Sequence, residues 1–402
     1  NGEIYNHQSL RKPLSGPFQG SSDTETLLEL IAQRGLKVAL SEIDGMTAFA
    51  AYDRIDNKLH LYRDPFGIKP LYFVATDNAF HFCSELRGLA AMGVDFQVDN
   101  DGLDAFLTLR YSPSPRTLLK NIQRLPPGHL LTLDFKSASL EIHSVVQPSP
   151  IKPNWRFSDA LLAYTETLKG AIQRQLMSDV PVGMLLSGGI DSAMIAAMAK
   201  EAGTRLKTFT VGFGNQSDAC EIDDAAHTAA VLGLDHAVVS VDPESLWPDF
   251  AAIVGAIEEP LGTTSVLPMW QLTQRARQDV TVVLTGQGSD EPWGGYRRYQ
   301  MELIRQKAPN QLWKIMSIGQ RLARGTTRLP EHIRRGLRSL PIGDDSLRFL
   351  AAYEMFSAAD RLALTGRDQS TYALTAIRKW LDWLGDSSMS SPDKMMRIDS
   401  RL

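Results

Sequence analysis

The sequence predicts an α+β domain built on a sheet, followed by an α/β domain with a doubly wound parallel sheet and a helical C-terminal region. Two observations support this division. Short strand-like runs separated by turn residues fill roughly residues 1–145, and apolar runs that alternate with helical patterns follow. Between them, VQPSPIKP carries three prolines in eight residues, which is typical of an extended linker. The expected division is 1–145, a linker at 146–155, and 156–402.

In the first part, one amphipathic helix precedes the strands. The segment SSDTETLLELIAQRG has acids in its first turns, Asp23 as its candidate N-cap and Gly35 as its stop. Strand-like runs follow at residues 46–53, 58–64, 70–75 and 129–135, with turn residues between them. Runs of strands with few helices indicate a sheet-based α+β domain and not a series of βαβ units.

In the second part, apolar strands alternate with helices. Strand-like runs occupy residues 180–186, 206–213, 236–241 and 279–285. Helical patterns cover Ser192 to Ala202 and the segment DDAAHTAAVLG, and from residue 300 the pattern is mostly helical. Near-continuous apolar strands of this kind indicate a parallel sheet that is covered on both faces.

The composition limits the function classes. The 402 residues are 43% hydrophobic and 22% charged, and the formal net charge is -4, so nucleic acid and anionic membranes are not expected partners. No apolar run approaches the ~18 residues that a membrane span needs. The two cysteines, Cys83 and Cys220, are too few for a cysteine-based zinc site, and a reducing, cytoplasmic setting is expected.

The stretch SGGIDS follows an apolar strand and opens a helix. Gly188 and Gly189 let the backbone approach a ligand, and Ser187 and Ser192 add hydroxyls at the positive end of the helix. These groups form a cradle for phosphate oxygens. Asp191 would repel phosphate unless a divalent cation lies between them, so the stretch predicts Mg²⁺ with a pyrophosphate group. The alternative, a turn that binds nothing, would not need the serines or Asp191.

A second glycine-rich loop, LTGQGSDEPWGGYRRY, follows the apolar run at 279–285. It carries adjacent carboxylates at Asp290 and Glu291. Ligands of doubly wound sheets bind at the carboxyl ends of the strands, so this loop and SGGIDS are expected to face one pocket. Asp191 and Asp290 would then share a metal ion. The alternative is an acidic turn on the surface.

SGGIDS resembles the loop of the PP-loop ATP pyrophosphatases. Together with GQGSDEPWGGY, IEEPLGTTSVLP (257–268) and TFTVGF, it resembles the asparagine synthetase family. The resemblance implies that ATP is split between its α and β phosphates, that an acid is adenylated, and that Asp191 and Asp290 hold Mg²⁺. The residues that it places around ATP are Leu185, Ser187, Gly188, Gly189, Asp191, Ser192, Val211, Thr285 and Gly286.

One position departs from the family pattern. Where the family commonly has an acid, this chain has Gln287, which can contact the acceptor or its intermediate but cannot act as a general base. By the resemblance, aspartate is the default acceptor, giving asparagine through a β-aspartyl-AMP. Gln287 favours another carboxylate, such as a uronic acid of a surface polysaccharide or a secondary-metabolite acid. A non-catalytic relative that only binds nucleotide is a further alternative.

The segments NGEIYNH, SSDTE, GMTAFAAYD, RDPFGIKPLY and FCSELRGL cover residues 1–90 in order. They resemble the class II, Ntn-type glutamine amidotransferase domain, an αββα sandwich. The resemblance implies that the Asn1 side-chain amide and the Gly2 N–H form an oxyanion hole. It also implies that Asp23 binds the glutamine ammonium group, with Glu3 alongside. Taken alone, Asn1-Gly2 is typical of a hairpin turn.

The resembled family uses an N-terminal cysteine as nucleophile, and residue 1 here is Asn1. We therefore expect the chain to lack a piece at both ends and to lack glutaminase activity. Cys83 is expected to be a buried small hydrophobic residue, and acids beside Cys220 disfavour a thiolate.

Two histidines and one charged pair are assigned structural roles. His7 and His129 are expected to be structural or on the surface, and Arg63 and Asp64 to form structural pairs. The expected partners are glutamine, ATP and a carboxylic acid. A homodimer is one expectation for the oligomeric state.

Overall fold

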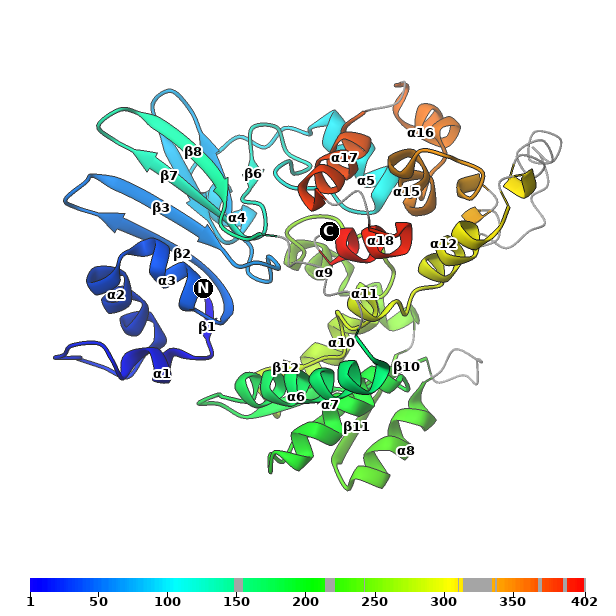
Figure 1. The fold of residues 1–402 in the computed structure, drawn as a ribbon, viewed down its shortest axis with the longest axis horizontal. Helices are drawn as coiled ribbons and strands as arrows, with labels where there is room; N and C mark the ends of the chain where they lie inside the picture. Colours follow the sequence, from blue (N-terminus) through cyan, green and yellow to red (C-terminus); the bar gives the residue numbers. More distant parts are fainter. Residues whose placement is uncertain are drawn as a thin grey trace.

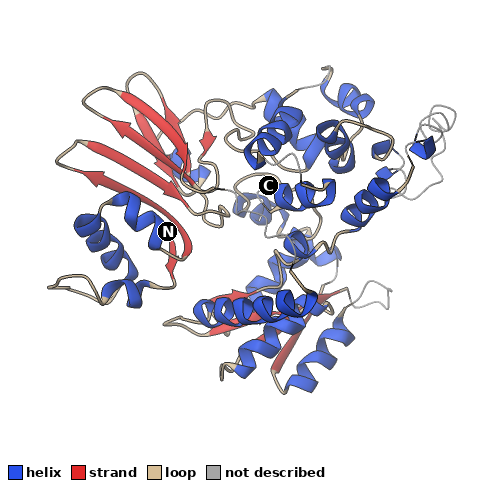
Figure 2. Ribbon diagram, in the orientation of Figure 1, coloured by secondary structure: helices blue, strands red, loops and turns tan. Residues whose placement is uncertain are grey.

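The computed structural model describes residues 1–147, 155–213, 221–241, 243–309, 311–313, 335–336, 338–367, 371–385 and 389–400. Its strands gather in two separate groups, as Figure 2 shows. The strands of the first part stand beside the C-terminal helices, and the second group of strands lies below both in the view of Figure 1. Among the described helices, none combines the length and the apolar character that crossing a membrane requires.

The first part holds two antiparallel sheets. The five-stranded sheet has the order β1 (Gly2–Ile4), β2 (Gly45–Asp53), β3 (Lys58–Arg63), β7 (His129–Asp134) and β8 (Ser139–Ser144). The three-stranded sheet has the order β5 (Phe80–Cys83), β4 (Tyr72–Ala75) and β6 (Gln123–Arg124). The helices of this part are α1 (His7–Arg11), α2 (Asp23–Arg34), α3 (Leu36–Glu42), α4 (Leu86–Ala91) and α5 (Asn100–Leu109). The predicted strands thus form, and β1, β5, β6 and β8 join them.

Alternating side chains hold these layers together. Ala48 of β2 and Phe73 of β4 meet in a core between the two sheets, whereas the next residue of β2, Phe49, packs toward α1, α2 and α3. On the outer side of the three-stranded sheet, Tyr72 and Val74 pack against α4. The order of layers is therefore helices, sheet, sheet, helix.

The start of α2 corrects one prediction. Ser22, and not Asp23, is the N-cap, because its hydroxyl accepts a hydrogen bond from the Glu25 N–H at 3.2 Å. Asp23 is the first helical residue. Gly35 ends the helix as predicted, with φ at 86°.

The second part contains a parallel sheet with the order β11 (Asp235–Ser240), β10 (Lys207–Gly212), β9 (Val182–Leu185) and β12 (Val282–Leu284). Its helices are α6 (Phe157–Gln175), α7 (Ile190–Glu201), α8 (Ile222–Leu232), a 3-10 turn (Pro243–Leu246), α9 (Phe250–Ala256) and α10 (Val266–Ala276). Met184 faces a core with α6, α7 and α8, and Phe209 faces a core with α10. Helices thus cover both faces, which confirms the predicted parallel sheet.

The remaining described helices are α11 (Asp290–Trp293), α12 (Arg297–Lys307), α15 (Asp345–Tyr353), α16 (Ala358–Thr365), α17 (Tyr372–Leu384) and α18 (Ser391–Asp399). Four of them, α12, α15, α17 and α18, share a core with α5, although α5 belongs to the first 145 residues: Ala105 and Leu109 pack with Phe349 and Ile377. A salt bridge of 2.8 Å between Arg124 and Glu259 also joins the two parts. Most of the linker predicted at 146–155 lies outside the described residues.

A buried arginine ties three of these helices together. Arg348 of α15 is fully buried, and its Nε donates to Glu302 Oε1 of α12 at 2.8 Å. Its Nη2 donates to the Ser391 hydroxyl of α18 at 2.8 Å. The carbonyl oxygens of Ile342 and Gly343 accept from Nη1. A guanidinium with this many partners fixes how α12, α15 and α18 are arranged.

Replacing Arg348 with methionine tests this network. The change leaves the Glu302 carboxylate buried without its counter-charge, so we expect the free energy of unfolding to fall by about 3–5 kcal/mol. Urea denaturation followed by tryptophan fluorescence measures the loss. Arg54→Met, which removes an exposed arginine, is the matched control and should change stability by less than about 0.5 kcal/mol. A loss of under about 1 kcal/mol for Arg348→Met would show that the network does not stabilise the fold.

Candidate functional site

The two glycine-rich loops meet because their strands are neighbours. β9 and β12 are parallel and paired, so the turn before α7 and the loop before α11 leave the sheet at the same edge. The contact is close: a Cβ on Gly286 would lie 3.0 Å from the Ser192 backbone nitrogen. A residue with a side chain at 286 would push the loop away from the start of α7.

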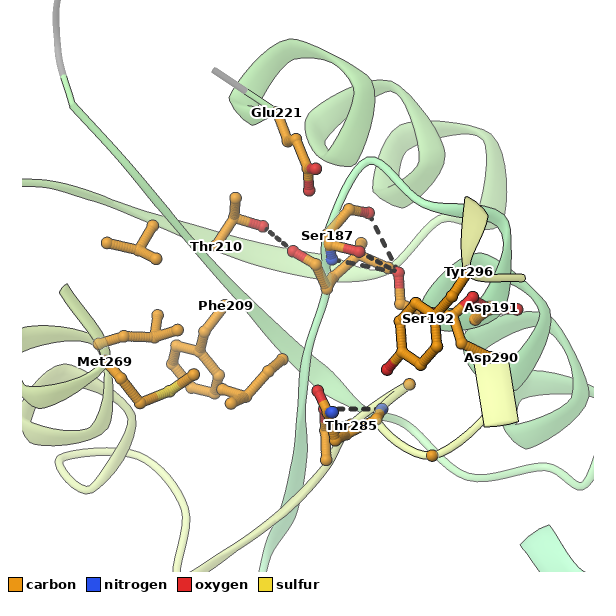
Figure 3. Close-up of a pocket in the computed structure, with 17 residues that line it drawn as sticks. Ser187, Asp191, Ser192, Phe209, Thr210, Glu221, Met269, Thr285, Asp290 and Tyr296 are labelled. Carbon is orange, nitrogen blue, oxygen red and sulfur yellow. Dashed lines mark hydrogen bonds between the residues drawn. The ribbon is translucent and has the colours of Figure 1, made fainter. Parts of the chain in front are cut away.

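A cavity of about 490 Å³ opens where the loops meet (Figure 3). Of the residues predicted for the site, those that line it are Leu185, Ser187, Asp191, Ser192, Val211, Thr285, Gly286, Gln287 and Asp290. Residues that the sequence did not predict complete the lining: Leu186, Phe209, Thr210, Glu221, Met269, Leu272, Gly288 and Tyr296. The structure therefore brings together both motifs and the strand that lies between them in sequence.

Hydroxyl groups organise the turn after β9. Ser192 is 3% exposed, and its Oγ lies 3.0 Å from Ser187 Oγ and accepts from the Ser187 N–H at 3.1 Å. The Gly189 N–H donates to Ser187 Oγ at 3.2 Å. The two serines thus hold the turn in shape and place their hydroxyls at the cavity, as Figure 3 shows.

Gly188 and Gly189 lie in this turn but do not line the cavity. The Gly188 N–H, which the sequence assigns to a phosphate, donates instead to Glu221 Oε2 at 3.0 Å. A Cβ on Gly188 would lie 2.9 Å from the Cβ of Asp224, so the turn packs tightly against α8. The Glu221 carboxylate therefore occupies the position at this N–H group that the sequence analysis assigns to a phosphate oxygen.

Two carboxylates, Asp191 and Asp290, lie near each other on one side of the cavity, one from each loop (Figure 3). Burial raises the pKa of Asp191, and the negative charge of Asp290 raises it further. Gly295 leaves room for the Asp290 side chain, because a Cβ there would lie 1.8 Å from Asp290 Oδ1. Two acids held this close fit a divalent cation that also takes phosphate oxygens, since oxygen ligands are those that Mg²⁺ prefers.

Tyr296 closes the side of the cavity near Asp290 (Figure 3). Its hydroxyl donates to Glu291 Oε1 at 2.8 Å, and the guanidinium of Arg298 lies 3.9 Å from the centre of its ring. Arg298 in turn binds Asp399 of α18 with its Nη2 at 2.6 Å. The loop after β12 is thereby anchored to the C-terminal helices.

An apolar wall faces the acids. Phe209 comes from β10, and Met269 and Leu272 come from α10. The Thr210 hydroxyl donates to the Leu186 carbonyl oxygen at 2.5 Å, which fixes β10 against the turn. Gln287 lies on the loop, where its own N–H is 3.3 Å from the Thr285 hydroxyl. Among the lining residues that the sequence analysis missed, Tyr296 belongs to the GGY motif quoted above. Met269 and Leu272 of α10 belong to no motif.

The residues predicted for a glutamine site gather at β1. Gly2 has φ at 122°, and a Cβ there would lie 1.9 Å from the Met46 carbonyl oxygen, so only glycine fits this position. Asp23 lies at the start of α2, and its Oδ2 accepts from the Ile4 N–H at 2.9 Å. Burial raises the pKa of Glu3, and Asp23 raises it further. Asn1 precedes them, and its side chain is exposed.

The other predicted roles can be located. Arg63 and Asp64 do not pair with each other: Arg63 donates to backbone carbonyls, and Asp64 accepts from the N–H groups of residues 66, 68 and 69. Both support the loop after β3. Cys83 is partly buried and packs with the core beneath α4. His129 Nδ1 lies 2.8 Å from the Pro127 carbonyl oxygen, and His7 begins α1. Cys220 lies outside the described residues.

Comparison with protein families decides the relationship. Residues 163–400 match the family described as asparagine synthase, and residues 1–144 match the glutamine amidotransferase domain. The chain belongs to the asparagine synthase family. The asparagine synthase match includes both loops of the cavity. The glutamine amidotransferase match includes β1 and Asp23.

Curated relatives agree with this family. The chain is 35% identical over 312 residues to asparagine synthetase [glutamine-hydrolyzing] 1 of Bacillus subtilis (strain 168), which is 75% of this chain and 48% of that protein. It is 30% identical over 315 residues to a putative asparagine synthetase [glutamine-hydrolyzing] 2 of Methanocaldococcus jannaschii, covering 76% and 60%. It is 30% identical over 341 residues to amidase chyE of Penicillium rubens, covering 79% and 49%. The chain spans about half the length of most of these relatives.

Replacing Asp290 in this cavity tests whether its carboxylate repels that of Asp191. The folded-state pKa of Asp191 lies above its unfolded value of about 3.9, so ionising it costs stability at higher pH and costs nothing below that value. Without divalent metal, Asp290→Asn should therefore raise the thermal unfolding midpoint at pH 7. The gain should vanish as the pH falls to about 3.

Thermal unfolding in EDTA across this pH range measures the effect. Asp77→Asn, in the exposed turn between β4 and β5, is the control and should leave the midpoint unchanged at both pH values. A lower midpoint for Asp290→Asn at pH 7 would show that the two carboxylates do not repel each other.

Proposed function

We propose that this chain is the amide-forming part of a glutamine-dependent amidotransferase. ATP activates a carboxylic acid as its acyl-adenylate, and ammonia released from glutamine then displaces AMP to form an amide. The observation that carries this proposal is the meeting of Asp191 and Asp290 beside the Ser187–Ser192 turn in one cavity. Membership of the asparagine synthase family supports it.

Different residues of the cavity would bind different parts of ATP. Phe209, Val211 and Met269 offer an apolar wall for the adenine, and the hydroxyls of Ser187 and Ser192 can donate to phosphate oxygens. Asp191 and Asp290 would hold Mg²⁺, which neutralises the charge of the departing pyrophosphate. To engage the Gly188 N–H, a phosphate must displace the Glu221 carboxylate that now accepts from it.

The proposed reaction has two steps. A carboxylate oxygen of the acceptor attacks the α-phosphorus, and the bond to pyrophosphate breaks. Ammonia then attacks the acyl carbon, AMP leaves with the bonding pair, and the nitrogen loses a proton. Gln287 lies on the loop that carries Asp290, where its amide can hydrogen-bond the acceptor but cannot take that proton.

Aspartate is the first candidate acceptor, since B. subtilis asparagine synthetase 1 is a relative at 35% identity. A different carboxylate, such as a uronic acid or a secondary-metabolite acid, is the second candidate. Two observations favour it: Gln287 lines the cavity where an acid is common in the family, and a relative bears the name amidase.

The first domain would carry the glutamine-binding groups of an Ntn-type ammonia source but not its N-terminal nucleophile, since residue 1 is Asn1. Gly2 and Asn1 would provide the oxyanion hole, with Glu3 nearby. Asp23 would bind the substrate ammonium through Oδ1, because Oδ2 already accepts from the Ile4 N–H. The Thr24 hydroxyl, at 3.3 Å, is the contact of Oδ1 in the structure, and an ammonium group can displace it.

Release of pyrophosphate from ATP, with ammonium chloride as the nitrogen source, tests the proposal. The measurement uses a panel of carboxylic acids that includes aspartate and uronic acids. We expect one acid to stimulate release and to yield its amide and AMP in equal amounts. Stimulation by another acid and none by aspartate would reject the first candidate. Binding of ATP with no stimulation by any acid would favour the non-catalytic alternative.

A variant at Gln287 then locates the acceptor. Gln287→Ala should lower the acid-dependent rate about tenfold, the effect of one lost hydrogen bond to a charged group, and leave ATP affinity unchanged. Gln278→Ala is the matched control, because Gln278 is exposed beyond the end of α10. If ATP affinity falls and the acid dependence stays, Gln287 contacts the nucleotide instead.

A further inference from the structure

The segment between α9 and α10 lies against the first part of the chain. It runs from Glu258 to Ser265, and α10 begins directly after it. Two residues of α10, Met269 and Leu272, line the cavity between the two glycine-rich loops. This segment, residues 258–265, therefore joins the surface of the first part to one wall of that cavity.

Two adjacent glutamates bind the segment to the first part. Glu258 Oε2 accepts hydrogen bonds from the N–H groups of Leu86 and Arg87 at the start of α4, and Glu258 Oε1 lies 3.1 Å from Arg87 Nε. Glu259 Oε2 accepts from Arg124 Nη1 of β6 at 2.8 Å, and the Glu259 side chain is 13% exposed. The two carboxylates thus hold the segment to two separate elements of the first part.

Gly262 brings the backbone of the segment against the end of α5. Its N–H donates to the Arg110 carbonyl oxygen at 3.1 Å. A Cβ on Gly262 would lie 2.3 Å from the Arg110 Cβ and 2.8 Å from the Arg110 Cα. Because the two chains leave no room for a side chain here, any other residue would move the segment away from α5.

The two halves of α10 are held differently. Leu272 and Ala276, in the C-terminal half, are buried in a core with the sheet. Met269, in the N-terminal half, lies outside that core and is 40% exposed. Trp270 beside it bonds Asp249 through Nε1 at 3.3 Å. The N-terminal half is thus packed less closely on the sheet, so its position responds to the segment that precedes it.

We propose that segment 258–265 is a positioning element for nucleotide binding. Through Glu258, Glu259 and Gly262, the first part of the chain sets where the first turns of α10 lie, and with them the place of Met269 against the adenine. This inference rests on the proposed function, in which ATP occupies the cavity. A change at the contact with the first part should therefore alter ATP affinity without touching ATP. The phosphates, which the Ser187–Ser192 turn would bind, should not be affected.

Gly262→Ala tests this link, because Gly262 does not line the cavity. ATP and inorganic pyrophosphate, each with Mg²⁺, are titrated into the protein by calorimetry. We expect ATP to bind about fivefold more weakly, a size typical of substitutions that act at a distance, and pyrophosphate to bind as before. A substitution that only weakened the fold would change both affinities or neither. Gly255→Ala in α9 is the matched control, since nothing lies within 4 Å of a Cβ there, and it should change neither affinity.

Glu258→Ala reaches the same segment without adding atoms, so it tests the link even if Gly262→Ala fails to fold. It should weaken ATP binding about threefold and leave pyrophosphate binding unchanged. Glu166→Ala, at an exposed position of α6, is its control. Unchanged ATP affinity in Glu258→Ala and in folded Gly262→Ala, or an equal loss of ATP and pyrophosphate affinity, would overturn the proposal. No binding of ATP by the unaltered chain would reject the proposed function, and this link with it.

Discussion

The close approach of the loop after β12 to the start of α7 determines the rest of the site. Gly286 lies against the Ser192 backbone, and this contact is available because β9 and β12 are paired neighbours in a parallel sheet. It places Asp290 near Asp191, in the cavity that the hydroxyls of Ser187 and Ser192 also line. Without bound metal the two acids repel each other, which is a cost to the fold that a cation and a triphosphate would remove.

Packing outside the sheet maintains this arrangement. Tyr296 is held by Glu291 and by Arg298, and Arg298 is held by Asp399 of α18. With α12, α15 and α17, α18 shares a core with α5, which comes from the first part of the chain. The salt bridge between Arg124 and Glu259 is a second link between the two parts. The cavity between the two glycine-rich loops is therefore coupled physically to the domain that carries the proposed glutamine site, through α5, β6 and α17.

Local patterns allowed much of the fold and site to be predicted. Strand, glycine turn and helix are encoded within SGGIDS and its flanks, and the rule that ligands bind at the carboxyl ends of parallel strands brought Asp191 and Asp290 to one pocket. Other features depend on packing that no short pattern encodes. Met269 reaches the cavity from α10, α5 packs among helices that are distant in sequence, and Glu221 occupies the Gly188 amide. The N-cap of α2 was misplaced by one residue because Ser22 and Asp23 are both good caps.

Titration of ATP into the chain, by calorimetry in Mg²⁺ and in EDTA, tests most directly whether the paired acids hold a metal–phosphate group. If Asp191 and Asp290 do so, ATP should bind at least about tenfold more tightly with Mg²⁺, because without it two carboxylates face the phosphates. Asp191→Asn should remove most of that difference. Equal affinity in Mg²⁺ and EDTA, or no binding of ATP in either, would contradict the account.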